Sequence, residues 1–374
     1  MNIEMITTPA ALQQVAARLA GEPILACDLE ADSMHHYREQ VCLVQISTPT
    51  ASLVIDPLAC PDLSPLAPIF ADPSILKIFH GADYDVRSLH RDFGITIENL
   101  FDTMVASQFL GEPAVGLAAV LKKRFGVELD KRYQQADWTR RPLPAEMVDY
   151  AVKDTTLLLE LYRQQTAELE RMGRLAWVRE ECTLLTRVRM TERRDEPLVF
   201  RFKGASKLAP ATLVVLEELL RFRDQEAERR DLPPFKILGT DTLRELAERK
   251  PGAPDELNGI QGLSPRLVER FGKGILAAVQ RGRALAPDQA PRFPRRERVE
   301  RSRSQEERLK RLKEWRTAKA DQLRMEPGIL ANNSLLETLV DQPIKNPAGL
   351  ASVAGLKGWQ LQALGAELLA ILAR

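Results

Sequence analysis

The hydrophobic pattern of this chain changes near residue 200, and that change constrains the fold more than any other feature of the sequence. Before it, short apolar runs rich in β-branched residues, which predict strands, alternate with amphipathic segments, which predict helices. The predicted strands are ILACDL, EQVCLVQIS, ASLVID and SILKIFH, and the predicted helices span 8–20, 63–70, 84–93, 115–125 and 144–171. After it, only helical patterns remain. The sequence therefore predicts an α/β domain followed by all-helical domains.

The helical part repeats one plan twice. Each copy has an aromatic residue, an arginine and, four residues after the arginine, an alanine: Phe222, Arg223 and Ala227 in the first copy, and Trp315, Arg316 and Ala320 in the second. Between the copies, residues 281–304 are rich in Arg and Pro, which predicts an exposed linker. We expect one helical domain over 208–285, a linker over 286–303 and a second helical domain over 304–374.

Acidic residues of the α/β part occur in three contexts whose geometry can bring carboxylates together. Asp28 and Glu30 end the predicted strand ILACDLE, where side chains two residues apart share a face, about 7 Å apart. Tyr150 and Asp154 lie one turn apart on a predicted helix. Asp85 lies in GADYD, at the start of another predicted helix. Each pattern alone is weak, because a D-x-E at a strand end is usually only a solvated terminus.

Clusters of carboxylates without thiolate or imidazole suit Mg²⁺ or Mn²⁺, which prefer oxygen ligands. Two such ions about 4 Å apart can activate a water and stabilise the leaving oxygen during phosphodiester cleavage. Asp83, in the same GADYD segment, is better explained as a residue that caps the following helix, because Asp is a preferred N-cap residue.

The motifs DLE, HGADYD and YAVKD, in this order, resemble the three exonuclease motifs of the DEDD superfamily in its tyrosine-containing branch. The stretches CLVQIS, LHRDFGI, LFDT and LDKRYQQADWTRRPLPAEMVDYA are similar to the ribonuclease D family, and the duplicated helical modules resemble tandem HRDC domains. The resemblance implies an α/β ribonuclease-H-like exonuclease domain over 1–200, a mixed sheet with flanking helices, followed by two all-α HRDC domains.

The resemblance also implies an activity, a 3′→5′ exoribonuclease that releases 5′-mononucleotides from tRNA precursors or other structured RNAs. It implies that four acids hold two Mg²⁺ or Mn²⁺ ions: Asp28, Glu30, Asp85 and Asp154. Tyr150 would orient the attacking water, because a phenol with an ordinary pKa near 10 is a poor base. Two alternatives stay open, a DNA exonuclease of the same family and an RNA-binding scaffold that has lost activity.

The histidine-containing branch of these nucleases is disfavoured, because none of the four histidines lies in the third motif. His80, at the end of SILKIFH, is expected to have a packing or hydrogen-bonding role. Basic residues before the third motif are predicted to contact RNA: Lys131, Arg132, Arg140 and Arg141.

Charge is distributed unevenly along the chain, although its net charge is only +1. Residues 1–200 carry 21 Lys and Arg against 29 Asp and Glu, whereas the remainder carries 32 against 23. A basic C-terminal half would attract the phosphate backbone of RNA, the expected partner. For any single basic residue, including those of the linker, solvation of an outer face is the simpler explanation.

The expected location is the cytoplasm. The first 20 residues lack the pattern of a signal peptide, and no apolar stretch is long enough to span a bilayer. The four cysteines have no C-x-x-C spacing and are expected to be buried free thiols, as in a reducing compartment. We expect no membrane association and find no sign of an obligate protein partner.

Overall fold

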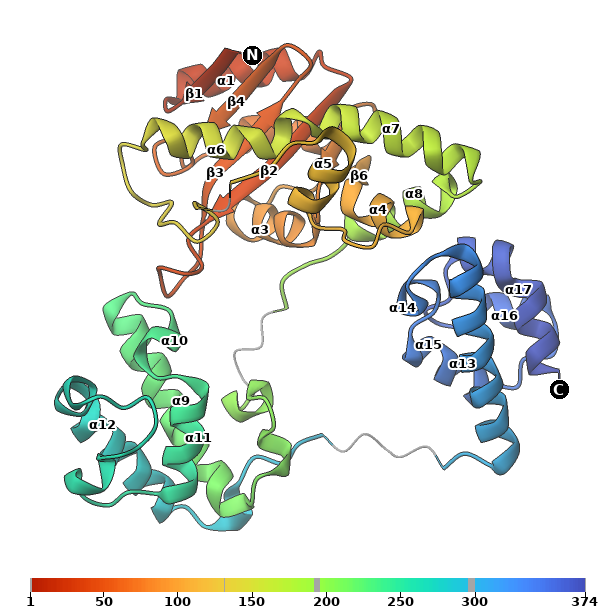
Figure 1. Cartoon of the computed structure of the whole chain (residues 1–374). Coiled ribbons are helices and arrows are strands. Elements are labelled where there is room, and N and C mark those ends of the chain that lie inside the picture. The colour runs from red at the N-terminus through yellow and green to blue at the C-terminus, as the bar shows by residue number, and fades with distance from the viewer. Residues whose placement is uncertain (1, 131, 192–195, 295–299, 374) are drawn as a thin grey trace. The chain divides into compact units, whose positions relative to one another are not determined.

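The computed structural model describes residues 2–130, 132–191, 196–294 and 300–373 (Figure 1). The chain divides into two compact units. The first contains Met1–Ala31, Val41–Met190 and Arg298–Arg374, and the second contains Asp32–Gln40 and Thr191–Glu297. The N-terminal and C-terminal parts of the sequence therefore belong to one unit.

Six strands form one mixed sheet in the first unit, in the order β1-β4-β3-β2-β5-β6. The pairs β1–β4, β2–β5 and β5–β6 are parallel, and β2–β3 and β3–β4 are antiparallel. The strands are β1 Asn2–Ile6, β2 Ile24–Ala31, β3 Val41–Ser47, β4 Ala51–Ile55, β5 Leu76–Phe79 and β6 Leu100–Asp102. The predicted mixed sheet with flanking helices is confirmed.

The sequence did not predict β1 or β6. β1 lies at an edge of the sheet, where the side chains of Ile3 and Met5 remain exposed, so it lacks the apolar run of a buried strand. β6 has only three residues, too few to show a periodicity. Both strands are defined by pairing with their neighbours β4 and β5.

Among the described residues, eight helices surround the sheet: α1 Pro9–Leu19, α2 Ala67–Ala71, α3 Asp83–Phe93, α4 Thr103–Leu110, α5 Leu117–Phe125, α6 Ala145–Thr156, α7 Leu158–Arg171 and α8 Leu175–Leu185. The sequence predicted one helix over 144–171, but the structure has two, with the break at Leu157. The hydroxyls of Thr155 and Thr156 both donate to the carbonyl of Val152, and such local bonds compete with the helical ladder. α6 packs across β2, β3 and β4, and α7 packs against β2 and β5.

The last five helices complete the first unit: α13 Arg303–Leu323, α14 Pro327–Leu330, α15 Asn333–Asp341, α16 Pro347–Ala351 and α17 Gly358–Leu372. Their contact with α8 centres on Trp359, whose ring stacks on that of Trp177 with the centroids 4.9 Å apart. The Glu180 carboxylate accepts hydrogen bonds from the first backbone amides of α17, at 2.6 Å and 2.7 Å. The guanidinium of Arg174 donates to the Leu323 carbonyl at 2.9 Å.

The second unit is helical: α9 Pro210–Arg230, α10 Pro234–Ile237, α11 Thr240–Arg249 and α12 Pro265–Ala284. α12 packs closely on α9, and a Cβ atom at Gly282 would lie 2.5 Å from the Cα of Val215. The segment between β2 and β3 joins this unit, where the Tyr37 hydroxyl donates to Asp224 at 2.9 Å. As predicted, no strand occurs beyond residue 200 in the described parts of the chain.

All four cysteines are buried and free, as predicted. Among the helices that the structure describes, none combines the length and the apolar character needed to cross a membrane.

Candidate active site

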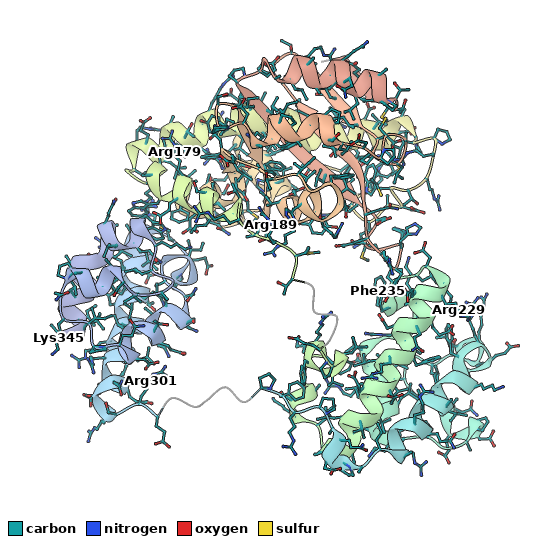
Figure 2. All side chains as sticks on the ribbon, turned by 180° about the vertical axis from the view of Figure 1, so that it is seen from behind. Arg179, Arg189, Arg229, Phe235, Arg301 and Lys345 are labelled. Atoms are coloured by element: carbon teal, nitrogen blue, oxygen red, sulfur yellow. The ribbon has the colours of Figure 1, made fainter. Side chains whose placement is uncertain are left out.

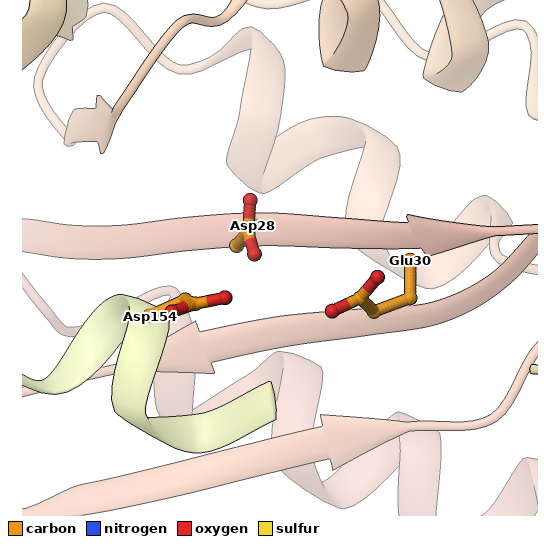
Figure 3. A group of neighbouring side chains, drawn as sticks. All are labelled: Asp28, Glu30 and Asp154. Carbon is orange, nitrogen blue, oxygen red and sulfur yellow. The ribbon is translucent and has the colours of Figure 1, made fainter. Parts of the chain in front are cut away.

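Three of the predicted acids converge at the centre of the sheet (Figure 3). Asp28 and Glu30 project from β2, and Asp154 approaches them from α6. One carboxylate oxygen from each of the three side chains lies within 4.8 Å of the other two. The period of two along a strand places Asp28 and Glu30 on one face, as the sequence predicted, and α6 packs on that face.

Strand pairing and a hydroxyl contact hold this arrangement. β2 is paired on both sides, antiparallel with β3 and parallel with β5, so Asp28 and Glu30 lie on a central strand. On β3 the Ser47 hydroxyl hydrogen-bonds to that of Thr155 at 2.7 Å, and both residues are fully buried. Because Thr155 directly follows Asp154, this bond fixes the helix that carries the third acid.

Asp85 lies in the first turn of α3 and is buried. Its charge contributes to raising the pKa of both Asp28 and Glu30. In the described residues its oxygens are not part of the three-residue group within 4.8 Å. The expectation that Asp83 caps α3 is wrong, because the N-cap residue is Ala82 and, among the described residues, no side chain caps this helix; Asp83 is the first residue of α3 and pairs with Arg87 on its surface at 2.6 Å.

The start of α3 is positioned by Asp102, the aspartate of LFDT. Its carboxylate accepts hydrogen bonds from the backbone amides of Gly81 and Ala82, at 2.9 Å and 2.8 Å, and from that of Met104. It therefore caps α4 and anchors the turn that leads to Asp85. Sequence reasoning noted LFDT only as part of a resemblance and missed this role.

Burial raises the pKa values of all four acids, and repulsion from neighbouring carboxylates of the group adds to it at Asp28 and Glu30. Burial is the larger cause for Asp28 and Glu30, followed by the neighbouring carboxylates. Burial also raises the pKa of Asp154 to about 6 and that of Asp85 to about 7. Such a site favours a bound cation, because positive charge relieves the repulsion, and an all-carboxylate donor set fits a hard divalent ion. The residues present therefore fit a divalent cation.

Tyr150 lies one turn before Asp154 on α6. Burial, and then the charge of Asp154, raise the pKa of its phenol above the ordinary value, so the hydroxyl stays protonated at neutral pH. Its ring makes an edge contact with Tyr133, with the centroids 5.7 Å apart, and lies 6.0 Å from the ring of buried Trp138. Tyr150 is thus a hydrogen-bond donor held among aromatic rings.

The four basic residues predicted to contact RNA lie in different settings. Arg132 and Arg140 are exposed and pair with neighbouring aspartates, at 2.5 Å and 3.5 Å. The guanidinium of Arg141 is engaged within the fold, because it donates twice to Asp56, at 2.5 Å and 2.7 Å, and also to backbone carbonyls. Lys131 lies outside the described residues.

Gln45 is a further polar residue at the site. It is directly opposite Asp28 in the β2–β3 register and fully buried, and neither polar atom of its amide has a partner among the described residues. A polar residue in the middle of the apolar run CLVQIS was the only sequence signal for it. His80 has the hydrogen-bonding role expected of it, with Nδ1 2.8 Å from the Thr103 hydroxyl.

Comparison with known proteins agrees with this site. A family model described as 3′-5′ exonuclease matches residues 3–170, and the HRDC domain model matches 212–279 and 305–372. A ribonuclease D of Nitrobacter hamburgensis is 32% identical over 374 residues, covering 99% of this chain and 95% of the relative.

Two solved structures are also similar. Escherichia coli RNase D, described as an exoribonuclease involved in structured RNA processing, is 28% identical with a TM-score of 0.73, covering 100% of this chain and 99% of that one. The catalytic core of RRP6 from Trypanosoma brucei is 34% identical with a TM-score of 0.66, covering 75% of this chain and 79% of that one.

The mixed sheet and its converging acids, together with the matching family model, define a hydrolytic 3′–5′ exonuclease. Sequence identity with a ribonuclease D over nearly the full length of both proteins narrows the class further. The chain belongs to the ribonuclease D family.

Proposed function

We propose that this 3′–5′ exoribonuclease trims tRNA precursors and other structured RNAs in the cytoplasm, with two Mg²⁺ or Mn²⁺ ions as cofactors. The observation that carries the proposal is the convergence of Asp28, Glu30 and Asp154; Asp85, buried in the first turn of α3, adds its charge to theirs. Repulsion from neighbouring carboxylates raises the pKa of Asp28 and Glu30, and such perturbed groups are typical of functional sites. The same four residues would hold both ions.

Divalent ions bound there would supply Lewis-acid activation of water and would neutralise charge on the scissile phosphate. The chain's own residues would place the reacting groups. Carboxylates from β2, α3 and α6 would surround the terminal phosphodiester, and the protonated Tyr150 would orient the attacking water by a hydrogen bond. Water would add to phosphorus, the bond to the 3′-oxygen of the preceding nucleotide would break, and that oxygen would take up a proton. The released product is a 5′-mononucleotide.

RNA is the proposed substrate because the chain is similar to ribonucleases over nearly its full length. The curated relatives are named ribonuclease D, and the E. coli structure is described as that of an exoribonuclease. The intact set of acids argues against a scaffold that has lost activity. Arg132 and Arg140, both exposed beside the segment that packs on Tyr150, are proposed to contact the RNA strand.

Matched RNA and DNA strands, labelled at the 3′ or the 5′ end, test this function in Mg²⁺, Mn²⁺ or EDTA. We expect the 3′ label to leave as a mononucleotide at once, while the 5′-labelled RNA shortens stepwise and EDTA stops both reactions. Faster loss of DNA than of RNA would favour the DNA exonuclease. Loss of mononucleotides from the 5′ end, or unchanged turnover in EDTA, would contradict the proposal.

A further inference from the structure

A cavity of about 800 Å³ lies in the first unit, on the segment that leads into β6 and on α7 and α8. Its walls include Leu76, the first residue of β5, and Asn99, which precedes β6. Ligand pockets in proteins typically span about 300–1,000 Å³, so this cavity has the size of a binding site. It is separate from the acidic site, whose residues do not line it.

Three arginines line this cavity: Arg179, Arg187 and Arg189. Figure 2 labels Arg179 and Arg189, in the view from behind. Arg179 and Arg187 are exposed, and among the described residues neither guanidinium makes an ion pair or hydrogen bond. One acidic side chain, Glu98, also lines the cavity, so its walls carry a net charge of +2. Unpaired guanidinium groups at a cavity wall fit phosphate, which they can contact with two parallel hydrogen bonds.

The arginines are carried by ordered backbone. After α8 ends, the amides of Arg187 and Val188 donate to carbonyls of α8 at 3.2 Å and 3.1 Å. Arg189 donates through Nη1 to the carbonyls of Thr186 and Val188, which leaves its other nitrogens available. Its own carbonyl accepts a hydrogen bond from Arg87 of α3. The backbone that carries the positive groups is therefore ordered before any ligand arrives, which lowers the entropic cost of binding.

Aromatic side chains form part of the cavity wall. Tyr162 and Phe101 both line it, with their rings in an edge contact 4.8 Å between centroids, and Tyr162 is only partly buried. Positive charge beside an accessible aromatic face is the combination that binds single-stranded nucleic acid, with phosphates on the arginines and a base against the ring. A site for a free metal ion or an apolar ligand would not need arginines beside an aromatic ring.

The cavity lies at the opposite end of the parallel strands from the acids. Leu76 and Asn99 are at the N-terminal ends of β5 and β6, whereas Asp28 and Glu30 lie in the second half of β2, which runs parallel to β5. The part of an RNA that binds in this cavity is therefore not the nucleotide being cleaved. It belongs to the body of the substrate, upstream of its 3′ end.

We propose that Arg179, Arg187 and Arg189 form a docking site for the phosphate backbone of the substrate RNA, with Tyr162 as a platform for a base. The inference deepens the proposed function and rests on RNA being the substrate. The site would give structured RNAs an advantage over short oligonucleotides, because only a longer chain reaches it while its 3′ end occupies the acidic site.

The test uses the full chain with the double substitution Arg179→Glu and Arg187→Glu. Binding of a fluorescent tRNA precursor is measured in EDTA by anisotropy over a KCl series, and hydrolysis of a short 3′-labelled RNA is measured with Mn²⁺. We expect affinity for the precursor to fall about tenfold or more. The slope of log affinity against log salt should flatten by about 1.4, from two lost contacts of about 0.7 each. Turnover of the short RNA should be unchanged.

The matched control reverses the charge of two exposed arginines of α7 that do not line the cavity, by Arg163→Glu and Arg171→Glu. Circular dichroism first establishes that both double variants are folded. If the cavity variant binds the precursor with the affinity and salt slope of the control, the docking site is wrong. If inorganic phosphate binds the wild type through these arginines while RNA binding is the same in both variants, the cavity holds a small anion and not RNA. A wild type that cuts no RNA contradicts the proposed function itself.

Discussion

At the residue scale, Asp28 shows how the ionisation of an acid in the candidate active site depends on its neighbours. Burial, and then the charges of Asp85, Asp154 and Glu30, raise its pKa well above the ordinary value. A carboxyl with a raised pKa binds its proton more tightly in the folded protein than in the unfolded one. The folded protein therefore loses stability as the pH rises from the pKa of the unfolded state, about 4, through the raised pKa of the folded state. The metal-free protein therefore contains an unfavourable interaction that a bound cation relieves.

Asp28→Asn should stabilise the metal-free protein at neutral pH, because it removes charge from this cluster. Its melting temperature in EDTA should exceed that of the wild type by about 2–4 °C for each kcal/mol of relieved repulsion. The difference should disappear near pH 4, where the wild-type carboxyl is protonated, and Mn²⁺ should raise the melting temperature of the wild type more. Calorimetry over this pH range measures both effects. A variant less stable than the wild type at neutral pH in EDTA would contradict the electrostatic account.

Tyr150→Phe removes the hydroxyl and keeps the aromatic ring, so it tests the hydroxyl alone. If the hydroxyl orients the attacking water, kcat should fall about 10- to 100-fold with little change in RNA affinity, because the interaction matters chiefly in the transition state. The ring contacts with Tyr133 and Trp138 remain possible, so stability should change little. Single-turnover kinetics and anisotropy measure the two quantities separately. Lost RNA binding at unchanged kcat would make Tyr150 a substrate contact instead.

At the scale of elements, the segment before α6 supports Tyr150, the residue proposed to orient the attacking water. Arg141 ties this segment to the sheet through two hydrogen bonds to Asp56, a residue that is 4% exposed on its side chain. Trp138 and Tyr133, from the same segment, pack against Tyr150. The segment is therefore part of the active-site wall, and Arg141 acts on the site through the residues that it anchors.

Arg141→Ala should leave the Asp56 carboxylate buried without its partner, which costs on the order of 3 kcal/mol. We expect a lower melting temperature and a lower kcat, because Tyr150 loses its ordered neighbours, while RNA affinity stays near that of the wild type. Arg140→Ala, at the exposed neighbouring position, is the matched control and should keep both stability and kcat. If Arg141→Ala instead loses RNA affinity with stability unchanged, Arg141 is the RNA contact that the sequence suggested.

Local periodicity explains what the sequence could predict at this scale. Asp28 with Glu30, and Tyr150 with Asp154, are related by the repeats of a strand and a helix, so each pair could be placed from spacing alone. Features that depend on distant pairing were missed. Gln45 lies opposite Asp28 only because β3 pairs with β2 in this register, and β6 exists only beside β5.

At the scale of the whole molecule, the second helical repeat belongs to the same compact unit as the sheet. The sequence predicted the helical modules and their order along the chain, and the HRDC model matches both. Periodicity shows which face of a helix is apolar but not which partner covers it, so the contact of α17 with α8 was not foreseen. The predicted domain bounds stay a prediction.

Trp359→Ala should show that residues 298–374 stabilise the nuclease part. Trp359 is 2% exposed, contacts Trp177 and Phe109, and donates through Nε1 to Glu181 at 2.8 Å. Truncation of a buried tryptophan costs about 3–5 kcal/mol, so the melting temperature should fall clearly. Thermal unfolding measures the change in melting temperature, and limited proteolysis then shows which part of the chain has become sensitive. If the C-terminal helices alone become sensitive to protease and the nuclease part does not, the two parts are energetically independent.

The central claim is that one acidic centre carries out hydrolysis at the 3′ end of RNA. The most direct measurement is the single-turnover rate of 5′-mononucleotide release from 3′-labelled RNA by the wild type, Asp28→Asn, Asp154→Asn and the double variant. We predict that each single variant is slower by at least about 10³-fold and that the double variant is little slower than either, because residues of one centre act as a unit. A wild-type rate in either single variant, or losses that multiply in the double variant, would contradict the claim.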